Sequence, residues 1–216
     1  MVPTSAFYSH NVEVIDLPEC LSISSYAFNL YQYDYSAPAP VLSYLSLPKV
    51  QYIANYAFRN NGASNLQQSD ISFPECLSIG SGAMFANISA ITSIYLPKVR
   101  YVGSDAFFNC RNVEELDLPE VISCGGFGAD AYGLGSAGLK RASLPKCTTL
   151  FGAFKYQSNL SEVYAPLVST LNGYNFTQCA KLSSLVIDFS HLKYISNYDF
   201  AQTTIFNNFD SCPDLE

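Results

Sequence analysis

A motif that ends in proline recurs along the whole chain of 216 residues, and no other feature restricts the fold as strongly. In its clearest copy, Ile91–Cys110, an apolar residue and two spacers precede Ile94, and one spacer separates Ile94 from Leu96 and Pro97. The residues at the anchor place are Pro18, Pro48, Pro74, Pro97, Pro119, Pro145, Pro166 and, in the eighth copy, Asp188. Successive anchors lie 21 to 30 residues apart. Such self-similarity predicts a solenoid of stacked repeats.

The residues just ahead of each anchor alternate between apolar and polar. One place before the anchors stand Leu17, Leu47, Phe73, Leu96, Leu118, Leu144, Ala165 and Ile187, and three places before stand Ile15, Leu45, Ile71, Ile94, Leu116, Ala142, Val163 and Leu185. This period of two predicts a short strand with one buried face. Proline then ends the strand, because it has no N–H to offer the ladder.

The part of each repeat that follows the anchor carries a second set of apolar columns. Residues two and five places on are mostly Cys, Val, Ile or Leu, and a small residue then precedes a large one, as in Ala27-Phe28 and Ala106-Phe107. We interpret this pair as a tight bend whose aromatic ring fills the core. The fifth repeat lacks the pair at the expected place. One repeat cannot bury enough apolar surface alone, so stability has to come from stacking on neighbours.

We therefore expect residues 1–216 to form a single solenoid of about eight rungs. Residues 5–10 resemble the tail of a preceding repeat, and residues 209–215 resemble a bend that leads into another strand. The expectation is a segment of a longer array, or a short array whose cap rungs have diverged.

The repeat resembles the BspA-type leucine-rich repeat, most clearly at Ile91–Cys110 and Val12–Phe28. The resemblance lies in the motif Leu-x-x-Leu-x-Leu-Pro, which is followed by the Val and Ile positions, the Ala-Phe pair and a cysteine. The resemblance implies a right-handed leucine-rich-repeat superhelix with one parallel β-sheet and short turns or 3-10 segments on the opposite side. It also implies a bacterial cell-surface or secreted protein, since such repeats are associated with adhesion to host or bacterial surfaces. The motif specifies a fold far more than a ligand.

Charge and hydropathy exclude several classes of partner. The net charge of −7 and the isoelectric point of about 4.7 disfavour nucleic acid and anionic membranes. No apolar run approaches the length of a membrane-spanning helix, and residues 1–12 lack the apolar core of a signal peptide. The extracellular location therefore follows from the resemblance alone.

The seven cysteines fit the core better than a disulfide framework or a metal site. Cys20, Cys76 and Cys147 share a column with valines, and Cys124 stands in the isoleucine column. We expect them to be buried free thiols. The chain has no Cys-x-x-Cys pair and two histidines, which disfavours zinc.

Three further patterns have structural explanations that outweigh catalytic ones. Glu114, Glu115 and Asp117 face Lys140 and Arg141 in the next rung, and the residues after the anchors alternate in sign through Glu19, Lys49, Glu75, Lys98, Glu120 and Lys146. These charges are interpreted as cross-strand ladders that set the register. The Gly-rich motif at 133–138 lies in an insertion without a following helix, so it predicts a loop and no dinucleotide site.

The sequence also predicts no enzyme, cofactor or metal site. The two histidines, His10 and His191, fall at opposite ends of the stack, and no serine or cysteine has a histidine within reach.

Tyrosines and insertions are the remaining candidates for binding a partner. Tyr44, Tyr95 and Tyr164 occupy outward columns ahead of the anchors, and Tyr52, Tyr101 and Tyr194 recur just before the fifth place. The first insertion, 29–40, adds Tyr31, Tyr33 and Tyr35, and the second is Gly125–Gly138. Exposed tyrosines suit recognition of protein or glycan, although tyrosine is also a common residue on any sheet surface.

The leading expectation is a non-enzymatic adhesion or protein-recognition module whose partners are host or bacterial surface proteins, among them extracellular-matrix proteins. A glycan-binding module and a structural spacer within a larger surface protein remain the alternatives. The chain is expected to be monomeric or to associate weakly end to end, without entering the membrane.

Overall fold

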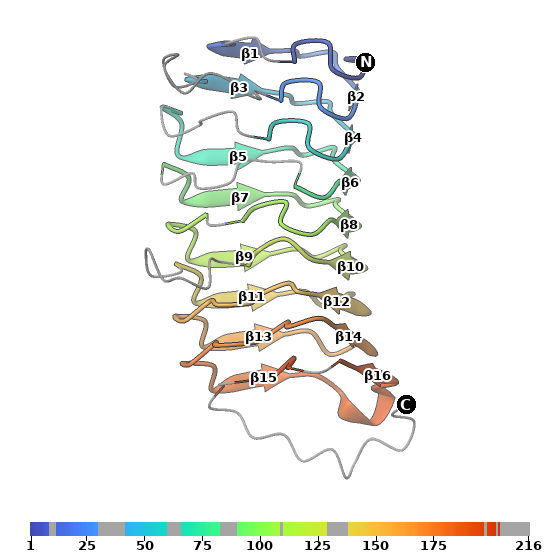
Figure 1. The fold of residues 1–216 in the computed structure, drawn as a ribbon, viewed down its shortest axis with the longest axis vertical. Helices are drawn as coiled ribbons and strands as arrows, with labels where there is room; N and C mark the ends of the chain where they lie inside the picture. Colours follow the sequence, from blue (N-terminus) through green and yellow to red (C-terminus); the bar gives the residue numbers. More distant parts are fainter. Residues whose placement is uncertain are drawn as a thin grey trace.

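The computed structural model describes residues 1–8, 12–29, 42–59, 66–82, 90–108, 110–128, 138–196, 198–201 and 203. In this part the chain winds into an elongated stack of rungs, and each rung contributes two short strands (Figure 1). This is the leucine-rich-repeat type of solenoid that the sequence predicts.

The first strand of each rung lies directly ahead of the anchor. These three-residue strands are β1 (Val14–Asp16), β3 (Tyr44–Ser46), β5 (Asp70–Ser72), β7 (Ser93–Tyr95), β9 (Glu115–Asp117), β11 (Arg141–Ser143), β13 (Glu162–Tyr164) and β15 (Ser184–Val186). The middle residue is buried in all of them but β15, where Leu185 is partly buried, and the flanking residues face outward. Before the anchors, Leu47, Leu96, Leu118 and Leu144 are at most 1% exposed, while Leu17 in the first rung is partly buried. The predicted column assignment is confirmed.

The second strand begins four residues after the proline anchor in the first seven rungs and six residues after Asp188 in the eighth. These strands are β2 (Ser22–Ile23), β4 (Tyr52–Ile53), β6 (Ser78–Ile79), β8 (Tyr101–Val102), β10 (Ser123–Cys124), β12 (Thr149–Phe151), β14 (Thr170–Asn172) and β16 (Tyr194–Ile195). They form an unbroken eight-stranded parallel sheet. The sequence predicts strand only ahead of the anchors, because one apolar residue per two-residue strand is too short a pattern to reveal a ladder. A 3-10 turn, η2 (Phe189–His191), lies in the last rung.

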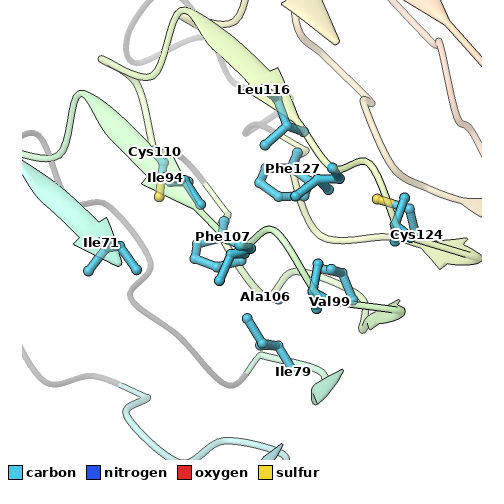
Figure 2. Packing of buried hydrophobic residues seen from close by; sticks show 14 of the residues in the cluster. Ile71, Ile79, Ile94, Val99, Ala106, Phe107, Cys110, Leu116, Cys124 and Phe127 are labelled. Atoms are coloured by element: carbon cyan, nitrogen blue, oxygen red, sulfur yellow. The ribbon is translucent and has the colours of Figure 1, made fainter. Parts of the chain in front are cut away.

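The core lies between the two ladders and is organised around the bend aromatics. Phe28 stacks on Phe7 at 5.0 Å and on Phe58 at 5.3 Å between ring centroids, with nearly parallel planes. Figure 2 shows Phe107 and Phe127 in the interior of the stack, and their centroids are 5.1 Å apart. Phe127 thus takes the bend place in the fifth rung, where no Ala-Phe pair marks it. Parallel aromatic pairs add to the stability that area burial alone supplies.

Close backbone packing at one corner explains a glycine after the β8 strand. A Cβ on Gly103 would lie 2.4 Å from the backbone nitrogen of Ser81 in the rung before it. Real Cβ atoms do not approach a neighbour so closely, so the two rungs can stack here only without a side chain.

Candidate binding surfaces

Three of the predicted tyrosines are described, and all three face solvent from the first ladder. The exposed fractions of Tyr44, Tyr95 and Tyr164 are 47%, 56% and 47%. Tyr95 and Tyr164 share the column two places before the anchor, three rungs apart, while Tyr44 stands two places earlier along its strand. They mark one face without forming a continuous patch. Tyr31, Tyr33 and Tyr35 lie outside the described residues, as does most of the second insertion.

A second set of outward tyrosines lies on the eight-stranded sheet. Tyr52 and Tyr101 are each 51% exposed, and Ser78 lies between them in the same column. Tyr194 continues the column in the last rung at 43% exposure. The predicted recurrence of these tyrosines is confirmed as an aligned column.

The structure also reveals corner tyrosines that sequence reasoning missed. Tyr26, Tyr56, Tyr174 and Tyr198 lie two residues before the bend residue of the Phe column and have positive φ angles of 58°, 59°, 64° and 70°. Their rings stack in pairs, Tyr26 on Tyr56 at 5.3 Å and Tyr174 on Tyr198 at 5.6 Å. Because a side chain with a Cβ is uncommon in the left-handed region, no propensity rule points to tyrosine here. Stacking covers one face of each ring.

The charged columns form the predicted cross-rung ion pairs. Lys49 lies 2.7 Å from Glu19, Lys98 lies 2.7 Å from Glu75 and Lys146 lies 2.6 Å from Glu120. On the strands themselves, Lys140 contacts Glu114, and Arg141 contacts Glu115 on one side and Glu162 on the other. All these side chains are well exposed, so each pair is worth about 0.2–1 kcal/mol. The pairs favour the observed register and leave these carboxylates engaged by cations.

The first ladder, unlike the second, is interrupted twice. Its strands form three separate groups, β1–β3, β5–β7 and β9–β11–β13–β15. Figure 1 shows β3 and β5, and again β7 and β9, farther apart than their neighbours, whereas the second strands keep an even spacing.

At the first interruption a glutamine side chain bridges the two strands. In the third rung the core residues Leu66 and Ile71 are five places apart, whereas Leu42 and Leu45 in the rung before are three apart. The extra residues carry Gln68, whose Oε1 accepts from the backbone N–H of Leu45 at 2.9 Å. Its Nε2 donates to the carbonyl of Asp70, also at 2.9 Å. The side-chain amide therefore takes the place of a direct backbone hydrogen bond from the Leu45 N–H to the Asp70 carbonyl.

At the second interruption a groove of about 680 Å³ opens beside β7 and β9. It is lined by Thr92, Ser93, Ile94, Arg111, Asn112, Glu114, Glu115 and Asp117. Within the described residues, no backbone hydrogen bond joins β7 to β9, although β8 and β10 directly behind them are paired.

The expectation that no serine has a histidine within reach is wrong at Ser190 and His191, but the geometry of this Asp–Ser–His group differs from that of a catalytic triad. Nδ1 of His191 lies 2.7 Å from Asp188 and 3.2 Å from the Ser190 hydroxyl, so both partners meet the same ring nitrogen. The hydroxyl donates to Asp188 at 2.6 Å, and hydrogen bonds from Ser190, with a further one to His191, lower the pKa of that carboxyl. In a triad the acid and the nucleophile contact opposite nitrogens. This group caps the exposed 3-10 turn.

The described cysteines have the properties of core residues. All six are buried and free, which confirms the predicted burial. Burial raises the pKa of Cys76, Cys110, Cys147 and Cys179 to about 12. At neutral pH these thiols are protonated and therefore weak nucleophiles. In the described part of the chain no cluster of three or more His, Cys, Asp or Glu side chains could hold a metal ion.

Comparison with known proteins identifies the repeat. A family model described as "BspA type Leucine rich repeat region" matches residues 1–132 and 132–215, in six copies. A crystal structure of a leucine-rich repeat protein from Bacteroides ovatus ATCC 8483 aligns over 98% of this chain and 62% of its own, with 17% identity and a TM-score of 0.49. The chain thus spans less than two thirds of that protein. No curated protein matches the chain. Among the described residues, no helix has the length and apolar character that crossing a membrane demands.

Proposed function

Because the chain belongs to the BspA-type leucine-rich repeat family, we propose that it is a non-enzymatic protein-recognition module that serves adhesion at a bacterial cell surface or in the secreted space. The family is one of protein-interaction repeats and is typically found at the surface or outside the cell. The proposed partners are surface proteins of host or bacterial cells, including extracellular-matrix proteins.

The observation that carries the proposal is the outward face of the first ladder. Its polar columns are held in register by backbone ladders and ion pairs, and Tyr44, Tyr95 and Tyr164 project from it half exposed. A tyrosine on a rigid strand offers a large amphipathic ring and loses little conformational entropy on binding. Such rings, surrounded by serines and charged pairs that can hydrogen-bond, suit a protein epitope.

A glycan-binding module is the second candidate, and the column of Tyr52 and Tyr101 favours it. Two rungs separate these rings, which is about 9.6 Å at ordinary strand spacing, and only Ser78 intervenes. Neither ring is stacked on another aromatic ring among the described residues, so their faces can meet sugar rings. The corner tyrosines suit this role less, because their faces pack on one another.

A binding screen with two matched triple variants separates these functions. Immobilised extracellular-matrix proteins, bacterial surface proteins and glycans are probed with the wild type, with Tyr44→Ser/Tyr95→Ser/Tyr164→Ser and with Tyr52→Ser/Tyr101→Ser/Tyr194→Ser. Protein adhesion predicts that the first triple weakens binding to a protein probe about tenfold or more, while the second changes it less than about twofold.

The other outcomes are equally informative. Loss of binding to a polysaccharide in the second triple alone would favour the glycan module. If the wild type binds none of the probes, or if neither triple variant changes binding, both the protein-adhesion and the glycan-binding proposals are contradicted. The remaining alternative is then a structural spacer within a larger surface protein. Circular dichroism and thermal melting of each variant verify that the fold is retained.

A further inference from the structure

One strand-to-strand hydrogen bond recurs through the first ladder and is missing at both of its interruptions. In five rungs the N–H of the residue before the anchor donates to the carbonyl two places before the next anchor: Leu17 to Ser46, Phe73 to Tyr95, Leu118 to Ser143, Leu144 to Tyr164 and Ala165 to Val186. Among the described residues the corresponding bonds from Leu47 to Ser72 and from Leu96 to Asp117 are both absent. Leu96 is only 1% exposed, so water has little access to this residue. A buried N–H without a partner costs free energy.

The other interruption shows how such an edge is satisfied in part, at the N–H of Leu45, the residue equivalent to Ile94. Between β3 and β5 the Gln68 amide accepts from one strand and donates to the other, each at 2.9 Å. A backbone peptide group has the same donor and acceptor as this side-chain amide. The chain therefore already contains one example of an inserted amide that joins two separated strands of this ladder.

The groove beside β7 and β9 has the open edges, and within the described residues no side-chain amide bridges the two strands, although Arg111 and Asn112 also line the groove. Rungs four and five have the regular core spacing, from Ile91 to Ile94 and from Val113 to Leu116, and so lack the extra residues that carry Gln68 in rung three. The rim is acidic on the β9 side, where Glu114 and Glu115 are engaged by Lys140 and Arg141 of the next rung. The exposed Asp117 makes no ion pair in the described structure and lines the groove.

We propose that this groove is the docking site for an extended segment of a partner protein, which inserts an amide group between β7 and β9 and places a lysine or arginine against Asp117. The inference rests on the proposed protein-recognition function and names the site within it. The amide bridges β7 and β9 as the Gln68 amide bridges Leu45 of β3 and Asp70 of β5. The basic side chain pairs with a carboxylate that no lysine or arginine of the described chain neutralises.

The test starts from a displayed library of short linear peptides, from which binders to the wild-type protein are selected and synthesised. The expected binders contain lysine or arginine, and they slow hydrogen exchange at the amides of Ile94 and Leu96 but not at those of Leu118 and Leu144. Asp117→Lys is expected to weaken them about tenfold or more.

Asp16→Lys is the matched control. Asp16 occupies the same outward column in the first rung, where β1 and β3 are paired, so this variant should change affinity less than about twofold. Equal losses in the two variants, protection at amides away from the groove, or failure to select any binder would each overturn the proposal. Retained binding of a surface protein in such a case would show that the groove is wrong while the recognition function stands.

Discussion

Nδ2 of Asn175 donates to Oδ1 of Asp199 at 2.7 Å, and both residues are almost wholly buried. The backbone N–H of Asn175 donates to the same oxygen at 2.9 Å, and the N–H and hydroxyl of Ser196 both donate to Oδ2 at 2.8 Å. Four earlier rungs carry alanine at the places of Asn175 and Asp199, namely Ala27, Ala57, Ala106 and Ala153, and the fifth carries Gly126. The last rungs are therefore joined by a polar network where the others have apolar contacts.

Asp199→Ala should lower the free energy of unfolding by about 2–4 kcal/mol, because the Asn175 amide would be left buried without its main partner. Chemical denaturation measures the change. Asn175→Ala/Asp199→Ala restores the alanine pattern of the earlier rungs and should lie closer to the wild type than the single variant does. A double variant that is as unstable as the sum of the two singles would contradict this coupling.

Gln68→Ala should destabilise the protein by about 1–3 kcal/mol, because it leaves the Leu45 N–H without an acceptor. The amide of Leu45 should also exchange faster with solvent. Gln67→Ala is the control, since the Gln67 side chain is exposed and only its backbone N–H bonds to the neighbouring rung. Similar stabilities for the two variants would mean that the inserted amide contributes nothing.

The thiols of Cys76, Cys110, Cys147 and Cys179 should resist alkylation at pH 8 in the folded protein. With a pKa of about 12 the reactive thiolate is scarce, and burial excludes the reagent. Peptide-resolved mass spectrometry after iodoacetamide treatment checks this, with guanidinium-unfolded protein as the fully labelled control. Rapid labelling of these four cysteines under native conditions would argue against the core they occupy.

Lys98→Glu should reduce stability by about 0.5–1 kcal/mol at low salt, since it replaces the pair with Glu75 by like charges in adjacent rungs. The loss should shrink as the salt concentration rises. Lys193→Glu makes the same change of net charge at an exposed residue that has no ion pair among the described residues. If Lys98→Glu behaved like Lys193→Glu at every salt concentration, the charged columns would have no role in stacking.

The anchors and their flanking columns made the main features of the fold predictable. An apolar residue three places before each proline marks the inward position of a strand, so the sequence alone predicts that Leu45 and Leu116 are buried. The ion pair between Glu75 and Lys98 could also be predicted from the alternation of charge, because side chains in one column of a parallel ladder lie next to one another.

The two interruptions of the first ladder were harder to predict from the sequence. The spacing of five between Leu66 and Ile71 signals the Gln68 insertion, but only after the core register of the other rungs is established. The opening between β7 and β9 has no such signal, because both rungs have regular spacing.

The unequal continuity of the two ladders also has a mechanical consequence. One flank of the stack is tied at every rung, while the other is tied only within three blocks, β1–β3, β5–β7 and β9–β15. Tension applied along the long axis should therefore separate the blocks first between β7 and β9, where no side chain of the described residues spans the gap, and next between β3 and β5, where Gln68 does. The block from β9 to β15 should be the last to yield.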